Sequence, residues 1–484
     1  MTITNATITG NSDTSGAATN AGGVSFSGGT ATLVNSVVAQ NTTSNNVAKD
    51  VRGTFAVGSN NDFLTFVDAN TNLANGVNGV IVGADPLLGP LQNNGGVTQT
   101  RLPLSGSPLL NAGSNTAVPT GITTDQRGDL RVVGTVDIGA VEVQKPTPLV
   151  TSGPPGGQAQ LFTPAAGGTF PSAPTATVAP FGSLTGNVRT ATGDVNGDGI
   201  PDTILVTGPG VPIQLAVISG ADNTTVLVAP FDPFGGGFTG GGFVAAGDFD
   251  GDGKDEFLVT PDQGGGPRVT IFSLSGGTAT MKANFFGIDD PNFRGGARAA
   301  VGDVNHDGTP DLIVAAGFGG GPRVAVFDGK TAFSGSPVKL VSDFFAFPGS
   351  DAVNLRNGVF VAAGDVDGDG FADLIFGGGP GGAPRVSILS GALVAANNVA
   401  GAQGAPLANF FVAGNSADRG GVRVAALDAD GDNKADVVAG SGEGSPGRVR
   451  VYLGKNFSGA GEPATFQDVT IAGGAAVTDG VFVG

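Results

Sequence analysis

Short apolar runs separated by turn-forming residues follow one another along most of the chain. Residues 2–9 alternate polar and apolar side chains, which is the period of a half-buried strand. In the second half, short runs such as residues 360–363 and 374–376 are apolar and bounded by glycine or acidic residues. The chain has 86 glycines and 30 prolines among 484 residues, which would interrupt long helices. The pattern therefore predicts an all-β protein.

The pattern at the start of the chain returns thirty positions later. Residues 2–11 (TITNATITGN) reappear as residues 32–41 (TLVNSVVAQN), with asparagines at matching places. Stacked rungs of a parallel β-helix have this property, and their asparagine side chains hydrogen-bond from rung to rung. We predict a short right-handed parallel β-helix fragment over residues 1–92. Two unrelated strands rich in threonine and asparagine remain the alternative.

A series of short motifs follows this repeat. They are residues 84–91 (ADPLLGPL), 94–100 (NGGVTQT), 106–108 (GSP), 125–128 (DQRG) and 137–142 (DIGAVE). The series resembles the C-terminal end of bacterial surface β-helix proteins of the choice-of-anchor type. The resemblance implies an extracellular helix with few rungs, and we assign residues 93–143 to its capping segment. Because repeat units depend on stacked neighbours, we expect this part to be the least stable.

Two smaller features lie near the end of this region. Arg127-Gly128-Asp129 spells an integrin-ligand tripeptide, but a chance match inside a structural motif is the interpretation we favour. Residues 144–148 contain the polar, proline-rich KPTP sequence and are expected to form a linker.

Five copies of one acidic loop pattern occupy the second half of the chain. Loop positions 1, 3, 5, 7 and 9 are Asp194, Asn196, Asp198, Ile200 and Asp202; Asp248, Asp250, Asp252, Lys254 and Glu256; Asp303, Asn305, Asp307, Thr309 and Asp311; Asp365, Asp367, Asp369, Phe371 and Asp373; and Asp428, Asp430, Asp432, Lys434 and Asp436. The first residues of successive copies are 54, 55, 62 and 63 positions apart.

This spacing is typical of calcium loops. Side-chain oxygens at positions 1, 3 and 5 converge when the chain turns sharply at position 6, which explains the glycine there. The backbone carbonyl of position 7 and the carboxylate of position 9 would complete the ligands. Asn433 replaces the glycine in the last copy, and Glu256 replaces aspartate in the second. We predict about five calcium ions; solvated Asp-Gly turns without metal are the alternative.

The segments around each loop predict four strands per repeat. Glycine-rich turns lead into third strands at residues 266–269, 321–324, 383–386 and 447–449, and paired phenylalanines mark fourth strands at 285–286, 344–345 and 410–411. Four strands in a repeat of this length form a propeller blade. These residues resemble the FG-GAP (VCBS, integrin-α-like) repeat over about residues 148–484, although the family's Phe-Gly…Gly-Ala-Pro signature is only partly kept. The resemblance implies calcium-binding loops and a role in adhesion, surface display or as an accessory domain.

We predict a six-bladed calcium-binding β-propeller over residues 149–484, with one blade assembled from both ends. Residues 149–154, 158–162 and 176–181 match the second, third and fourth strands of a blade. Residues 480–484 match the missing first strand, so the two ends would close the ring and remove an open edge.

Two rings of side chains are expected around the propeller. The first comprises Arg189, Phe243, Arg298, Phe360, Arg423 and Phe482, which alternate five positions before each loop or its equivalent. It forms either arginine–phenylalanine packing, which we favour, or an anion site of three arginines. The second ring comprises Gln158, Gln214, Arg268, Arg323, Arg385 and Arg448, on the face opposite the calcium loops. We expect this face to be the binding surface, although ion pairing could explain each arginine.

Charge and composition exclude several function classes. A net charge of −18 disfavours nucleic acid and anionic lipid as partners. Cysteine is absent, which excludes disulfides, a thiol nucleophile and cysteine-ligated metals. No apolar run reaches transmembrane length, so we expect no membrane insertion. The N-terminus carries no visible signal peptide and reads like the middle of a repeat, so we expect a piece of a longer protein.

We therefore expect a non-enzymatic, secreted or cell-surface bacterial module for adhesion, binding or display. Its partner would be a protein or polysaccharide of unknown identity, and the chain would be a monomer. The alternative is a secreted polysaccharide lyase or hydrolase that carries the propeller as an accessory domain. His306, the single histidine, lies inside a calcium loop and is a poor catalytic candidate.

Overall fold

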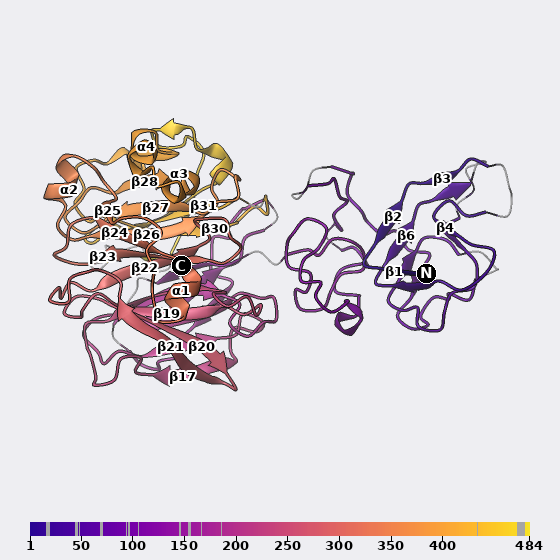
Figure 1. Cartoon of the computed structure of the whole chain (residues 1–484), viewed down its shortest axis with the longest axis horizontal. Helices are drawn as coiled ribbons and strands as arrows, with labels where there is room; N and C mark the ends of the chain where they lie inside the picture. The colour runs from indigo at the N-terminus through magenta and orange to yellow at the C-terminus, as the bar shows by residue number, and fades with distance from the viewer. Residues whose placement is uncertain are drawn as a thin grey trace. The chain divides into compact units, whose positions relative to one another are not determined.

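The computed structural model describes the chain except residues 16–19, 44–46, 48, 68–70, 93, 95–96, 105, 145–146, 153–155, 166, 185, 433 and 472–479. The chain divides into two compact units, Met1–Lys145 and Pro146–Gly484 (Figure 1). Residues 145 and 146 of the predicted linker at 144–148, and loop residue Asn433, lie outside the described residues. None of the described helices is long and apolar enough to cross a membrane.

Parallel strand pairs form the first unit. Strand β1 (Thr2–Thr4) pairs with β5 (Thr32–Val34), β3 (Ser12–Asp13) with β7 (Thr42–Thr43), and β4 (Val24–Ser25) with β8 (Val51–Arg52). Strands β2 (Thr7–Thr9), β6 (Val37–Ala39), β9 (Phe63–Leu64) and β10 (Ile81–Val82) make a four-stranded parallel sheet in the order β10-β9-β6-β2. Thr2 faces Thr32 and Thr7 faces Val37, so the strands pair at the thirty-residue offset of the sequence pattern.

Asparagines connect these stacked segments. The backbone N–H and the side-chain Nδ2 of Asn11 both donate to Oδ1 of Asn41 at 3.0 Å. Asn5 and Asn35 both adopt left-handed φ angles, 51° and 46°, at matching turns. Leu33, Val37 and Val38 are fully buried. Val37 and Val38 are consecutive in β6 and point to opposite faces, so they pack into two different apolar clusters. The predicted side-chain contact between matching asparagines is thus present at Asn11 and Asn41.

The segment after these strands has little regular structure but is tied to them. It contains the short 3-10 helix η1 (Asn115–Ala117). Ser114 donates its N–H to Oδ1 of Asn35 at 2.8 Å, and Ala140 donates to Oγ1 of Thr7 at 3.0 Å. Side chains in β2 and just after β5 therefore satisfy backbone groups of this segment.

The Arg-Gly-Asp tripeptide turns its arginine inward. The Arg127 side chain is only 6% exposed and pairs with Asp125 at 3.0 Å and with Asp129 at 2.8 Å. Its Nη2 also donates to the carbonyl of Glu142 at 2.7 Å. These contacts agree with a structural role for the tripeptide, since an integrin ligand must expose its arginine.

The second unit is a six-bladed β-propeller of antiparallel sheets. Blade 1 contains β11 (Leu149–Ser152), β12 (Ala159–Phe162), β13 (Ala176–Val178) and β35 (Phe482–Val483); blade 2 contains β14 (Val188–Gly193), β15 (Asp202–Thr207), β16 (Leu215–Ile218) and β17 (Val226–Phe231); blade 3 contains β18 (Gly242–Gly247), β19 (Glu256–Pro261), β20 (Arg268–Ser275) and β21 (Thr278–Phe286).

The remaining blades follow the same order. Blade 4 contains β22 (Ala297–Gly302), β23 (Asp311–Ala316), β24 (Arg323–Phe327) and β25 (Phe344–Phe345); blade 5 contains β26 (Val359–Gly364), β27 (Asp373–Gly378), β28 (Arg385–Leu389), β29 (Ala408–Phe411) and the added parallel β33 (Gly459–Ala460); blade 6 contains β30 (Val422–Leu427), β31 (Asp436–Ser441), β32 (Val449–Tyr452) and β34 (Gln467–Val469). Short helices lie in the connections: α1 (Gly329–Phe333), α2 (Ser350–Asn354), α3 (Gly391–Ala395), α4 (Val399–Gly404), η2 (Val412–Gly414) and η3 (Gly454–Asn456).

The ring closes through both ends of this unit, as the sequence predicted. Strand β35 pairs antiparallel with β11, with Thr151 opposite Val483 and Ser152 opposite Phe482. The second strands of blades 2 to 5 are buried along their whole length, because each packs against a neighbouring blade on both faces. The prediction of six blades, one of them composite, is confirmed.

Candidate metal centre

The five acidic loops all lie at the same end of their blades, between the first and second strands. In each loop, position 1 directly follows the first strand, and position 9 begins the second strand. Asp202, for example, faces Gly193 across β14 and β15, and Asp373 faces Gly364 across β26 and β27. Because the backbone of position 9 is held in the sheet, the rest of the loop folds back over the position-9 carboxylate.

The carboxylate at position 1 shapes each loop by accepting backbone hydrogen bonds. In the fourth loop, Oδ1 of Asp365 accepts from Gly368 at 2.7 Å, and its Oδ2 accepts from Gly370 at 2.9 Å. Gly370 stands at position 6 with a φ of 92°, the left-handed conformation that the spacing required. The same position-6 bond joins Gly199 to Asp194 at 2.7 Å.

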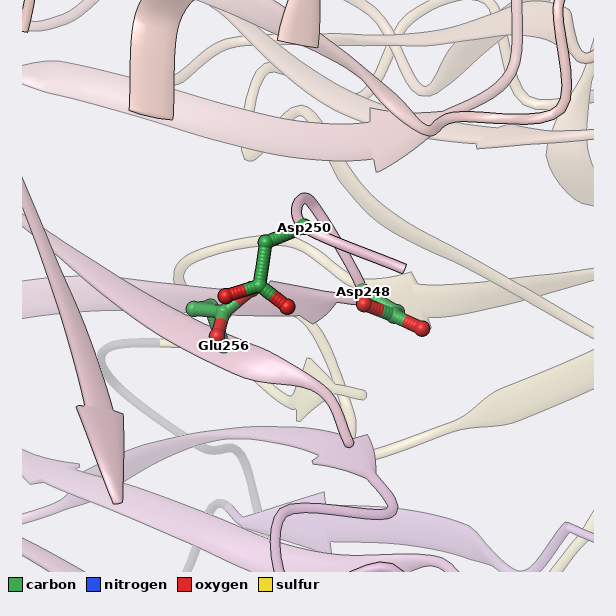
Figure 2. Close-up of side chains that lie close together, drawn as sticks. All are labelled: Asp248, Asp250 and Glu256. Atoms are coloured by element: carbon green, nitrogen blue, oxygen red, sulfur yellow. The ribbon is translucent and has the colours of Figure 1, made fainter. Parts of the chain in front are cut away.

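Carboxylates at positions 1, 3 and 9 converge in three loops. Ligand oxygens within each set lie within 4.8 Å of one another. The sets are Asp248, Asp250 and Glu256; Asp365, Asp367 and Asp373; and Asp428, Asp430 and Asp436. Figure 2 shows the carboxylate of Asp250 beside that of Glu256, with Asp248 on its other side. An oxygen-only set of this kind fits a hard cation such as calcium.

Two loops offer an amide in place of the position-3 carboxylate. Oδ1 of Asn196 accepts the N–H of Asp198 at 2.8 Å, and Oδ1 of Asn305 accepts the N–H of Asp307 at 2.9 Å. Both amide oxygens therefore hold the loop in the same way as Asp367, which accepts from Asp369 at 3.2 Å. Because an amide carries no charge, the first and third sites have one negative charge fewer than sites with aspartate at this position.

The position-9 carboxylates are the buried members of the sites. Asp202, Asp373 and Asp436 are fully buried, and burial is the main cause that raises the pKa of each to about 7. Loop carboxylates nearby raise the pKa further in every case. A bound cation would relieve both effects, since it compensates the desolvated negative charge.

The same carboxylates anchor the loop to a glycine eighteen residues later. Oδ1 of Asp311 accepts from Gly329 at 3.1 Å, while its Oδ2 accepts from Val304 at 3.0 Å. A Cβ on Gly329 would lie 1.8 Å from the carbonyl oxygen of Pro310, so only glycine fits. Glycines 220, 391 and 454 accept no side chain for the same reason and donate to Asp202, Asp373 and Asp436.

Positions 5 and 7 complete the loops. Oδ1 of the position-5 aspartate accepts the position-7 N–H, from Ile200, Lys254, Thr309, Phe371 and Lys434 at 2.9, 2.9, 3.0, 2.9 and 3.1 Å. Asp307 also pairs with Lys330 at 3.3 Å, and Asp432 lies 3.9 Å from Lys455. Metal ligation by the position-7 carbonyls stays a prediction.

One carboxylate oxygen in the fifth loop is available to bind a cation. Oδ1 of Asp430 is buried and has no hydrogen-bond partner among the described residues, while the Asp430 side chain is only 2% exposed. Its other oxygen, Oδ2, contacts Lys455, so a cation already approaches this carboxylate from one side. A buried carboxylate oxygen without a donor is costly unless a cation binds it.

Contacts between neighbouring loops were not foreseen from the sequence. The N–H of position 8 donates to the position-1 carbonyl of the preceding loop: Asp255 to Asp194 at 2.7 Å, and Ala435 to Asp365 at 2.7 Å. Asp255 also accepts the N–H of Asp194 at 2.8 Å, and burial is the main cause that raises its pKa to about 7. The sequence offered one sign of this contact between loops, because Asp255 is the only acidic residue at position 8 among the five copies.

His306 takes part in this network between loops. Its Nδ1 lies 2.5 Å from the carbonyl oxygen of Gly370, in the loop of the next blade. Its ring also packs against Phe371 at a centroid distance of 5.2 Å. The histidine therefore links two neighbouring loops.

The central ring of arginines and phenylalanines packs as alternating layers. The Arg189 guanidinium lies 4.5 Å from the Phe243 ring and 4.6 Å from the Phe482 ring. Arg298 lies 4.0 Å from Phe360, and Arg423 lies 4.9 Å from Phe360. These contacts agree with the packing interpretation.

The charges in this ring are balanced only in part. Arg189 pairs with Asp262 at 2.8 Å and Arg423 with Glu443 at 3.4 Å. Arg298 makes no ion pair in the part of the chain that the structure describes, and its Nη1 donates to the carbonyl of Asn357 at 3.0 Å. Burial lowers the pKa of Arg298 to about 10. The cavity beside the ring measures about 60 Å³, room for a small ion or a few waters, so the anion alternative stays open.

The third-strand ring is not uniform. Arg323 pairs with Asp343 at 2.7 Å, and Arg385 pairs with Asp351 at 2.7 Å. The side chains of Arg268 and Arg448 make no hydrogen bond or ion pair with the described residues. Gln158 and Gln214 precede β12 and β16. Structural ion pairing therefore accounts for Arg323 and Arg385 but leaves Arg268 and Arg448 without such a role.

Sequence comparison identifies the repeat to which the loops belong. Residues 194–259, 248–314 and 303–376 each match the FG-GAP-like repeat. The chain therefore contains FG-GAP-like repeats, as the sequence analysis expected from the acidic loops and glycine-rich turns.

Similar solved structures include two rhamnogalacturonan lyases and the Dos1 propeller. Rhamnogalacturonan lyase YesW is 16% identical, with 66% of this chain and 73% of that chain covered and a TM-score of 0.29. The Bacillus licheniformis rhamnogalacturonan lyase PL11 is 16% identical, with 63% and 65% covered and a TM-score of 0.30. The Dos1 propeller is 13% identical, with 67% and 75% covered and a TM-score of 0.33. These likenesses are too distant to indicate an activity.

Proposed function

We propose that the chain is a non-enzymatic, calcium-binding module that acts outside the cell or at its surface in adhesion, binding or display. The observation that carries this proposal is the convergence of carboxylates at positions 1, 3 and 9 within 4.8 Å in three loops. The buried, unpaired Oδ1 of Asp430 gives independent support. Because the five acidic loops all lie at one end of the propeller, the opposite face is free for a protein or polysaccharide partner.

Calcium serves structure rather than chemistry in this proposal. Positions 1 and 9 hold the loop through backbone hydrogen bonds, and the ion would neutralise the carboxylates that face one another. Extracellular calcium modules bind at about 10⁻⁴–10⁻³ M, so calcium outside the cell would keep such loops loaded. Each site would then contribute about 1.4 kcal/mol at ten-fold excess over its Kd.

We also propose that the first unit is a fragment of a right-handed parallel β-helix, as in bacterial surface proteins. Its parallel strands, thirty-residue register and Asn11–Asn41 contact support this assignment. In this proposal the chain acts as a monomer.

Thermal unfolding with and without calcium tests the calcium proposal. The melting temperature of the propeller should rise by many degrees between excess chelator and millimolar calcium, and magnesium should give a smaller rise because it demands octahedral ligands. An unchanged melting temperature would exclude calcium-dependent stability.

Incubation of the calcium-loaded chain with a panel of acidic polysaccharides tests the non-enzymatic assignment, since cleavage of any of them would contradict it.

A further inference from the structure

One cross-strand pair repeats on three consecutive blades, at the end opposite the calcium loops. The first residue of the third strand is an arginine, and the last residue of the fourth strand, directly opposite, is a phenylalanine. The pairs are Arg268 with Phe286 in blade 3, Arg323 with Phe345 in blade 4, and Arg385 with Phe411 in blade 5. We call these three pairs the Arg–Phe arc.

The phenylalanines of the arc are exposed although apolar neighbours are available. Phe286 is 46% exposed, Phe345 45% and Phe411 37%. The phenylalanine just before each one packs inward, as Phe410 does at 3% exposure. Consecutive residues of a strand point to opposite faces. Of the two neighbouring phenylalanines, each blade therefore packs one ring into its core and leaves the other at the surface.

A second arginine accompanies each pair. It stands two residues before a glycine with positive φ, in the connection to the next blade: Arg294, Arg356 and Arg419. Arg294 donates from Nη1 to the carbonyls three and one residues earlier, at 2.7 and 2.9 Å, and Arg419 does the same at 2.7 and 2.8 Å. These bonds hold both exposed side chains in the same pose on different blades.

The pairs in blades 3 and 5 line pockets of similar make-up. The blade 3 pocket measures about 430 Å³ and includes Phe238, Arg268, Phe286 and Arg294 in its lining. The blade 5 pocket measures about 370 Å³ and includes the equivalent arginines and phenylalanine. Both volumes lie in the usual range of small-ligand pockets.

Charge distinguishes the Arg–Phe pair of blade 3 from the pairs of blades 4 and 5. Arg323 and Arg385 are neutralised by Asp343 and Asp351, whereas no acid is among the residues that line the blade 3 pocket. Arg268 and Arg294 therefore give this pocket two positive charges in a chain whose net charge is −18. Such a pocket is complementary to a carboxylate or sulfate, which arginine binds through paired hydrogen bonds.

We propose that the Arg–Phe arc binds an acidic polysaccharide, with the blade 3 pocket as its principal subsite. Arg268 and Arg294 would bind the carboxylate of a uronate residue, and the exposed ring of Phe286 would pack against the C–H face of the sugar. The same pair on three neighbouring blades matches a polymer with repeating units better than the unique sequence of a peptide. This inference rests on the proposed binding function and adds the chemical class of the partner.

Binding of hyaluronan to the calcium-loaded full chain tests the inference, with dextran as a neutral polysaccharide and polyglutamate as an acidic polypeptide. Isothermal titration should detect hyaluronan binding that weakens as salt screens the charges, and none to dextran. The Arg268→Gln variant should bind hyaluronan about ten-fold or more weakly, because it loses a charge-assisted pair of hydrogen bonds. Phe286→Ser should also weaken binding.

Lys282→Gln is the matched control, because it removes one positive charge from β21 in the same blade but outside the pocket. It should bind like the parent. All variants should keep the calcium-dependent melting of the parent, which separates loss of the site from loss of the fold.

Three outcomes would overturn the inference. Hyaluronan binding that survives Arg268→Gln would place the site elsewhere. Polyglutamate binding without hyaluronan binding would make the partner an acidic protein. Absence of binding in a chain that calcium still stabilises would reject the acidic polysaccharide while leaving the calcium-dependent module intact.

Discussion

Ser152 and Phe482 are antiparallel partners in blade 1, although they come from opposite ends of the propeller sequence. Gly484 exchanges backbone hydrogen bonds with Val150 in both directions, at 2.9 and 3.0 Å. Val481 is fully buried and Phe482 is 6% exposed, so the last strand supplies core side chains as well as backbone pairing.

Removal of residues 481–484 should open the propeller. The loss of the Phe482 side chain alone costs about 3–5 kcal/mol, and the edge of β11 would also be exposed to other chains. We expect a lower melting temperature in calcium and the formation of aggregates on size-exclusion chromatography. Val483→Thr, which keeps the strand and changes a half-buried side chain, serves as the control. A truncated chain that stays monomeric and melts like the parent would contradict closure through this strand.

The calcium loops should tolerate an amide at position 3 but not an alanine. Elemental analysis after dialysis against millimolar calcium should give about five ions for the parent. Asp250→Ala should lose one ion, because the side chain is one of three converging carboxylates. Asp250→Asn should retain it with weaker affinity, since Asn196 and Asn305 occupy this position in other loops. Equal loss in both variants would mean that the first and third loops are turns without metal.

The first unit should become less stable as the pH rises. Burial raises the pKa of Asp62 to about 8, and its Oδ2 has no hydrogen-bond partner among the described residues. The folded chain therefore binds a proton that the unfolded chain releases near pH 4, so the free energy of unfolding falls from about pH 4 to pH 8.

Asp62→Asn tests this pH dependence. Its amide oxygen can still accept the N–H of Ser36, which donates to Asp62 at 3.0 Å, but it carries no charge. We expect the variant to be more stable than the parent at pH 8 by at least about 1 kcal/mol and similar to it at pH 4. Calorimetry of the first unit's transition in the full chain measures both values. A parent transition that does not move with pH would show that Asp62 stays ionised.

Arg298 should contribute through packing rather than through charge. Arg298→Met keeps the volume between Phe243 and Phe360 and removes a buried charge without a carboxylate partner, so we expect its stability within about 1 kcal/mol of the parent or higher. Arg298→Ala should lose about 2–4 kcal/mol because it leaves a cavity. Phosphate that stabilises the parent but not Arg298→Met would instead favour the anion site.

Much of the propeller could be predicted from local patterns. The position-1 and position-6 residues recur in register, and their hydrogen bonds, such as Gly199 to Asp194, stay within one loop. The composite blade could also be predicted, because residues 149–154 and 480–484 each match strands that are complete elsewhere. The links between loops could not, because Asp255 and Asp194 meet only when neighbouring blades are packed side by side.

The sequence by itself determined the strands, the acidic loops and the number of blades, because each depends on residue types at short, repeated spacings. The tertiary structure decided which of the equivalent arginines remain available. Arg268, Arg323 and Arg385 occupy the same place in their blades, yet Asp343 and Asp351 reach only the last two. Asp343 lies just before β25 and Asp351 lies in α2, and the segments between strands differ in length and fold from blade to blade. The repeat pattern in the sequence therefore does not show which arginine each acid pairs with. The free charge beside Phe286 is therefore a property of the packed molecule.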